Sequence, residues 1–162
     1  MHPALNLAHD VPKLRFDDIR VGFRARLGTC ALSRDASIAF ARSYDPEPFH
    51  LDDAAAAANP VFGRLSASGW HTAVMMKMLL SEFVKASGLH GLAGGGVKEM
   101  AWPKPVFPPS FLTISLEVMT IRASVSRPKL GIMTMRTTAV DEAGDCVATF
   151  ELTGIFARSI ES

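Results

Sequence analysis

The segment from Ser68 to Ser87 constrains the fold more than any other part of this chain. It has helical content, and apolar side chains cover most of the helix circumference: Trp70, Ala73, Val74, Met75, Met76, Met78, Leu79, Leu80, Phe83 and Val84. The polar stripe is narrow: Lys77, Ser81, Glu82 and Lys85. A helix that is apolar nearly all round has to lie inside a fold. We therefore predict a buried central helix, closed by the C-terminal glycine Gly88.

Strand-like segments lie on both sides of this helix. Residues 23–32 have strand-like content, as do residues 132–140. After a glycine-rich loop at Gly91–Gly96, apolar and polar side chains alternate along residues 112–118 and 146–152. This period of two is typical of half-buried strands. Residues 141–144 have the composition of a hairpin turn. The pattern predicts the α+β class, with a curved antiparallel sheet of about five or six strands wrapped around the central helix.

Two short helices are expected between the first strand and the central helix. Ser33 is a suitable N-cap for a helix to about Ser43, and a second short helix is predicted at residues 54–58. Two Xaa-Pro pairs, Asp45-Pro46 and Glu47-Pro48, cannot continue the first helix, because each proline lacks an N–H and pushes its predecessor toward extended geometry. They predict a stiff turn.

Composition excludes several classes of protein. The 162 residues fit one domain, which we place at residues 16–158 after a loose lead-in at residues 1–15. A net charge of +1 without charge blocks predicts no nucleic-acid partner. No apolar run is long enough to span a membrane, and residues 1–12 lack the pattern of a signal peptide, so we expect a cytoplasmic protein. Cys30 and Cys146 lack metal-ligand spacing, so no metal is predicted.

Two segments carry candidate chemistry. Asp45 and His50 are five residues apart on the proline-rich turn, which holds a carboxylate and an imidazole close enough for general acid/base catalysis. Ser68-Gly69 opens the central helix, where unpaired backbone N–H groups can donate to a developing negative charge. Structural roles fit the same residues: Asp45 in a local turn, His50 as a buried polar residue, and Ser68 as an ordinary cap.

Taken together, the segments resemble the MaoC-like dehydratase family, which includes the (R)-specific enoyl-CoA hydratases and has the hotdog fold. The family signature has the form D-x-N-P-x-H, and Asp45 to His50 match it at the aspartate, the second proline and the histidine, with Glu47 in place of the asparagine. The resemblance continues through Phe62–Thr72 and through Trp102–Val106, and it covers residues 16–156.

The resemblance implies a function and a set of site residues. It implies hydration of a trans-2-enoyl thioester, carried by coenzyme A or an acyl carrier protein, or the reverse dehydration, in fatty acid metabolism. Asp45, His50 and Gly69 would be catalytic, with the Gly69 N–H on the thioester oxygen, and no cofactor would be needed. The expected residues for substrate binding are Phe49, Ser68, Trp70 and His71. It also implies a homodimer or a higher oligomer.

Two other functions fit the same fold. One is an acyl-CoA thioesterase that activates water toward the thioester carbonyl, and the other is a non-catalytic protein that binds acyl thioesters. A minor interpretation gives Lys104 or Arg127 a role in binding the coenzyme A phosphates. A serine hydrolase does not fit, because Ser66 and Ser68 lack the G-x-S-x-G pattern.

Overall fold

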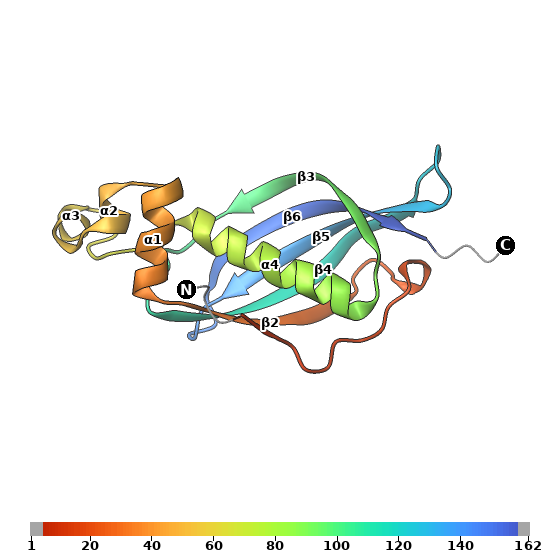
Figure 1. Cartoon of the computed structure of the whole chain (residues 1–162), viewed down its shortest axis with the longest axis horizontal. Helices are drawn as coiled ribbons and strands as arrows, with labels where there is room; N and C mark the ends of the chain where they lie inside the picture. The colour runs from red at the N-terminus through yellow and green to blue at the C-terminus, as the bar shows by residue number, and fades with distance from the viewer. Residues whose placement is uncertain (1–4, 159–162) are drawn as a thin grey trace.

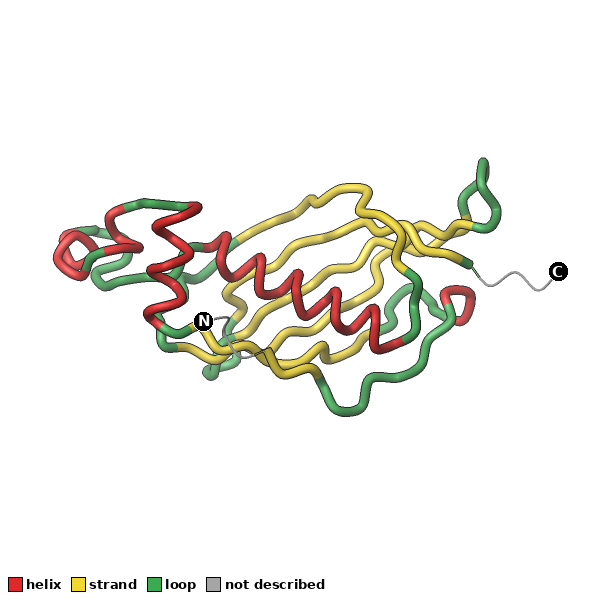
Figure 2. The backbone as a smooth tube through the Cα atoms, viewed as in Figure 1, coloured by secondary structure: helices red, strands yellow, loops and turns green. Residues whose placement is uncertain are grey.

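A computed structural model describes residues 5–158, whose strands form one antiparallel sheet that curves around a long helix (Figure 1). Figure 2 shows the same arrangement by type of element, with the long helix lying across the strands. The elements are, in chain order, β1 (Leu5–Leu7), the 3₁₀ helix η1 (Phe16–Asp18), β2 (Arg24–Leu32), α1 (Arg34–Tyr44), α2 (Pro48–Leu51), α3 (Asp53–Ala58), α4 (Gly69–Ser87), β3 (Gly91–Ala101), β4 (Ser110–Ala123), β5 (Leu130–Val140) and β6 (Cys146–Ala157).

The predicted central helix is confirmed as α4. Ser68 caps its N-terminus by accepting a hydrogen bond from the Trp70 N–H, and Gly88 ends it with a left-handed φ of 84°, which favours glycine. The apolar side of α4 packs on the inner face of the sheet, where both sets of side chains are buried: Met75, Met76, Leu79, Leu80 and Phe83 from α4, and Leu112, Ile114 and Val118 from β4. The alternating pattern of residues 112–118 therefore marks the core correctly.

The order of strands in the sheet is β1-β2-β4-β5-β6-β3. The three-residue β1 forms one edge, where Leu5–Leu7 pairs with β2 although the sequence predicts a loose lead-in there. The other edge is β3, which pairs with β6 alone among the described strands. The sheet therefore has one short edge and one long edge.

Two details of the predicted strands are wrong. The glycine-rich segment Gly91–Gly96 is the first half of β3 rather than a loop, since β6 provides its hydrogen-bond partners and irregular register accommodates its glycines. In β6 the predicted alternation holds at Ala148, Thr149 and Phe150, but Cys146 is exposed and Val147 and Glu151 are buried. The pairing with β5 is irregular at this end of β6: Ala139 pairs with Ala148 and Val140 with Cys146, so Val147 is the extra residue of a bulge.

The short helices gather at one end of the molecule. In Figure 1, α1, α2 and α3 lie beside the N-terminal end of α4, and the loop between β4 and β5 projects at the opposite end. The predicted helices are confirmed at α1 and α3, with side-chain caps from Ser33 and Asp52. The stiff turn at residues 45–50 is partly helical, because Pro48 begins the one-turn helix α2 that contains His50.

Candidate active site

Three segments meet at the N-terminal end of α4 and bring the predicted acid/base pair together. Asp45 directly follows α1 as its C-cap, where its N–H donates to the Ala41 carbonyl. His50 lies in α2, and the segment Ser66–Ser68 enters α4 beside it. The backbone fixes the spacing of the pair, since the Glu47 N–H donates to the Asp45 carbonyl and the His50 N–H donates to the Glu47 carbonyl.

Hydrogen bonding to His50 identifies the nitrogen that faces the carboxylate. His50 is 7% exposed, and its Nδ1 lies 2.7 Å from the Ser66 carbonyl oxygen. A carbonyl oxygen only accepts, so Nδ1 carries a proton, and in the neutral form of the ring Nε2 has the lone pair. That Nε2 lies 3.5 Å from Oδ2 of Asp45. The site therefore places an imidazole nitrogen and a carboxylate oxygen side by side.

The hydroxyl of Ser68 fixes the carboxylate of Asp45. The Ser68 Oγ donates to Oδ2 of Asp45 at 2.6 Å and accepts from the Trp70 N–H at 3.1 Å. Ser68 is fully buried, and the Asp45 side chain is only 24% exposed. Both hydrogen bonds of Ser68 are made within the protein. The geometry therefore gives this residue, expected to bind substrate, a positioning role toward Asp45.

Gly69 is required by the close approach of Trp102. A Cβ at position 69 would lie 2.7 Å from the indole ring of Trp102, a contact too short for real atoms. The indole Nε1 also donates to the Gly69 carbonyl at 2.8 Å. The glycine is thus explained by packing, whereas its predicted role rests on the N–H at the first position of α4, which has no carbonyl partner within the helix.

Two other residues predicted to bind substrate, Phe49 and Trp70, lie next to His50 and Gly69, respectively. Phe49 packs against the rings of His50 and Phe62, with centroids 4.5 and 4.9 Å away. Trp70 is 53% exposed and meets Trp102 edge to face. Phe49 therefore helps to enclose the imidazole, and Trp70 offers an exposed apolar surface next to Gly69.

His71 lies on the side of α4 that faces α1. Its ring stacks on Phe40 at 4.7 Å, and its buried Nδ1 has no hydrogen-bond partner among the described residues. Burial lowers the pKa of His71 below its usual range, because the charged form loses its hydration. The ring is therefore packed in its neutral form between α4 and α1.

Sequence reasoning assigned no role to two residues of the site. The Ser66 carbonyl fixes the tautomer of His50, and the Trp102 indole binds the Gly69 carbonyl. The first is a backbone interaction without a sequence signal, and the second joins residues 33 positions apart. The Lys104 ammonium donates hydrogen bonds to the carboxylates of Asp145 and Asp141, which also raise its pKa. These two acidic partners count against a contact between Lys104 and phosphates.

Comparison with known proteins identifies relatives of this chain. The sequence model of the MaoC-like domain matches residues 20–141. A MaoC-like dehydratase from Rhodospirillum rubrum is 33% identical, with a TM-score of 0.80 over 91% of this chain and 99% of that one. An (R)-hydratase from A. caviae, involved in PHA biosynthesis, is 27% identical, with a TM-score of 0.65 over 88% of this chain and 98% of that one.

A third structure shows the fold. A conserved hypothetical protein from Mycobacterium tuberculosis with a double hotdog fold has a TM-score of 0.76 and 18% identity, over 93% of this chain and 46% of that one. Together with the sheet wrapped around α4, this similarity confirms the predicted hotdog fold. None of the helices between residues 5 and 158 is both long and apolar enough to cross a membrane.

Proposed function

The chain belongs to the MaoC-like domain family, and from this membership and the geometry of its acid/base pair we propose that it hydrates a trans-2-enoyl thioester, or dehydrates the corresponding 3-hydroxyacyl thioester. The observation that carries the proposal is the distance of 3.5 Å between His50 Nε2 and Asp45 Oδ2 at the N-terminus of α4. Similarity to a MaoC-like dehydratase and an (R)-hydratase supports the hydratase/dehydratase class.

The pair is suited to hold a water molecule. Two acceptors 3.5 Å apart cannot bond to each other, but one water can donate a proton to each from normal hydrogen-bond distance. The Nε2 lone pair of His50 and the carboxylate of Asp45 then share the two hydrogens. Because Ser68 and Ser66 hold both side chains, the water oxygen has a defined direction toward a substrate.

The addition follows from this arrangement. The water oxygen forms a bond to C3 of the enoyl group while one of its protons passes to the Asp45–His50 pair. The electrons of the C2–C3 double bond move toward the thioester oxygen, where the Gly69 N–H and the positive end of α4 stabilise the negative charge. The pair returns the proton to C2, so the net change is addition of one water. Dehydration is the reverse.

One experiment separates this function from its alternatives. Crotonyl-CoA and longer enoyl-CoAs are incubated with the protein, and loss of the conjugated enoyl absorbance is followed in parallel with release of free thiol. A hydratase removes the absorbance without releasing thiol, and a thioesterase releases thiol. A binding protein does neither. Wild-type protein that leaves every enoyl-CoA in the series unchanged would contradict the proposal.

The same proposal includes a homodimer. The long edge strand β3 has no partner on its outer side among the described strands, and Leu92 and Val97 on this strand are about half exposed. Exposed edges are normally blocked or paired, and pairing of β3 with a second copy would continue the sheet across a two-fold axis. Light scattering coupled to size exclusion should give the mass of two chains, or of a multiple of two. A single-chain mass at every concentration would refute the dimer.

A further inference from the structure

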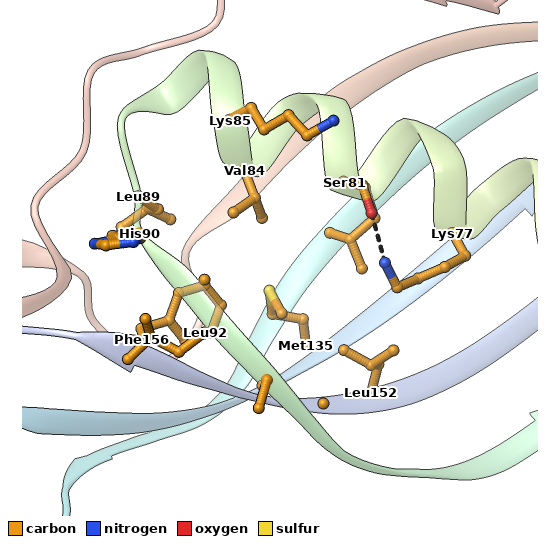
Figure 3. Close-up of a pocket in the computed structure, with 15 residues that line it drawn as sticks. Lys77, Ser81, Val84, Lys85, Leu89, His90, Leu92, Met135, Leu152 and Phe156 are labelled. Carbon is orange, nitrogen blue, oxygen red and sulfur yellow. Dashed lines mark hydrogen bonds between the residues drawn. The ribbon is translucent and has the colours of Figure 1, made fainter.

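One apolar groove of the described structure lies away from the acid/base pair. Its volume is about 400 Å³, and it runs between the C-terminal half of α4 and the start of β3 (Figure 3). Leu80, Val84, Met135, Leu152 and Phe156 give it an apolar lining. Two lysines of α4, Lys77 and Lys85, also line it.

A continuous stripe of α4 joins this groove to the site. Trp70, Val74, Lys77 and Ser81 follow one another at intervals of four, three and four residues, so they share one side of the helix. Trp70 and Val74 are 53% and 44% exposed, a large apolar surface that the monomer leaves uncovered. The stripe is therefore apolar next to Gly69 and becomes polar about two turns later.

Lys77 differs from the other groove lysine in its partners. Lys85 pairs with the Glu82 carboxylate at 2.8 Å. Among the ion pairs of residues 5–158, none involves Lys77, and its ammonium donates instead to the Ser81 hydroxyl at 2.5 Å. Figure 3 shows the Lys77 side chain bending from α4 toward Ser81 above Met135 and Leu152. The Ser81 oxygen accepts this bond, which leaves the Ser81 hydrogen free to donate to an anion.

We infer, on the basis of the proposed function, that the acyl chain of the substrate follows this stripe and that Lys77 and Ser81 bind a carboxylate at its far end. The substrate class would be enoyl thioesters whose acyl chain ends in an acid. An apolar chain fits Trp70, Val74 and the groove lining, and an ammonium beside a hydroxyl is complementary to a carboxylate.

The length of the chain follows from helix geometry. Lys77 and Ser81 lie eight and twelve residues after Gly69, which corresponds to about 12 and 18 Å along α4. An extended chain covers about 1.2 Å per bond, so the carboxylate would lie about ten to fifteen bonds from the thioester carbonyl. Acids of about four carbons are too short to reach Lys77.

Turnover of matched substrates tests this inference. trans-2-Enoyl-CoAs of about eleven to sixteen carbons are compared in two forms, one ending in a methyl group and one ending in a carboxylate. We expect kcat/KM of the wild type to favour the acid about five- to twenty-fold, mainly through KM, because the contact is made equally in the ground and transition states. Lys77→Met should abolish the preference, and Lys85→Met should keep it because Lys85 already has an acidic partner.

A binding experiment judges Lys77 independently of catalysis. Calorimetry compares decanoate with decanol on the wild type, Lys77→Met and Lys85→Met proteins. The carboxylate site is supported if the wild type and Lys85→Met prefer the acid and Lys77→Met loses this preference. This result would support the site even if the protein hydrated no enoyl-CoA. The absence of hydration would then refute only the proposed function. Equal binding of both ligands by the wild type, or a preference that Lys77→Met retains, would overturn the inference. Hydration without any preference would do the same while leaving the proposed function intact.

Discussion

Replacing Ser68 by alanine tests whether the carboxylate of the site has to be held in place. Ser68 is fully buried, and its hydroxyl makes two hydrogen bonds, to Asp45 at 2.6 Å and from the Trp70 N–H at 3.1 Å. The variant removes both without adding any atom. It leaves Asp45 and His50 chemically unchanged, so a loss of activity would report on their arrangement.

The expected magnitude can be worked from these two bonds. Loss of an N-terminal cap costs about 1 kcal/mol of folding stability. The bond to the carboxylate contributes about 1.5–3 kcal/mol, reduced by the water that can replace it at a side chain that is 24% exposed. If that second amount goes into orienting Asp45, kcat should fall about 10- to 100-fold, since about 1.4 kcal/mol corresponds to a factor of ten.

Ser33→Ala is the matched control. Ser33 caps α1 through the Ala36 N–H at 3.2 Å, and no carboxylate of residues 5–158 accepts from its hydroxyl. Both variants should lose about 1 kcal/mol in a denaturant titration through their caps, but only Ser68→Ala should also lose kcat. Initial rates on an enoyl-CoA accepted by the wild type would measure this difference. Equal kcat values for Ser68→Ala and Ser33→Ala would refute the positioning role.

Three further changes test other parts of the site. Asp45→Asn and His50→Gln should each lower kcat at least 100-fold while near-UV circular dichroism stays native, because an amide in place of the carboxylate or the imidazole cannot take a proton from water. Wild-type rates in either variant would exclude the assigned roles. Gly69→Ala should lower stability by about 1–3 kcal/mol by overpacking against Trp102, and Trp102→Leu should recover part of this in the double variant; an unchanged denaturation midpoint would contradict the contact. Because burial keeps the pKa of His71 low, the unfolded chain binds more protons than the folded chain below about pH 6.5. Stability should therefore fall as pH drops from about 6.5, and His71→Phe should reduce this fall in denaturant titrations at several pH values; an equal fall would assign it to other groups.

The fold could be predicted largely because its main signal is local. The apolar circumference of Ser68–Ser87 and the alternation at residues 112–118 each follow from short-range periodicity, and both are confirmed. Gly91–Gly96 shows the limit of this reasoning. Glycines have no side chains to alternate, so the pairing of this segment depends on β6, about 60 residues later in the chain.

The site also has a part that the sequence could predict and a part that it could not. Asp45 and His50 could be identified because they lie within six residues on one turn, and the structure places them 3.5 Å apart. The interactions that orient them join separate segments: Ser66 binds His50 across 16 positions, and Ser68 binds Asp45 across 23. Such contacts arise from tertiary packing, which no spacing rule within one segment describes.

The departure from the family signature at Glu47 can be understood from the backbone. Its N–H donates to the Asp45 carbonyl at 2.8 Å, and its carbonyl accepts from the His50 N–H at 2.9 Å. These two bonds hold the turn between the catalytic candidates, and any residue other than proline can supply both. The Glu47 residue is exposed, and its side chain caps no helix. The added carboxylate therefore does not disturb the geometry that brings Nε2 of His50 to Oδ2 of Asp45.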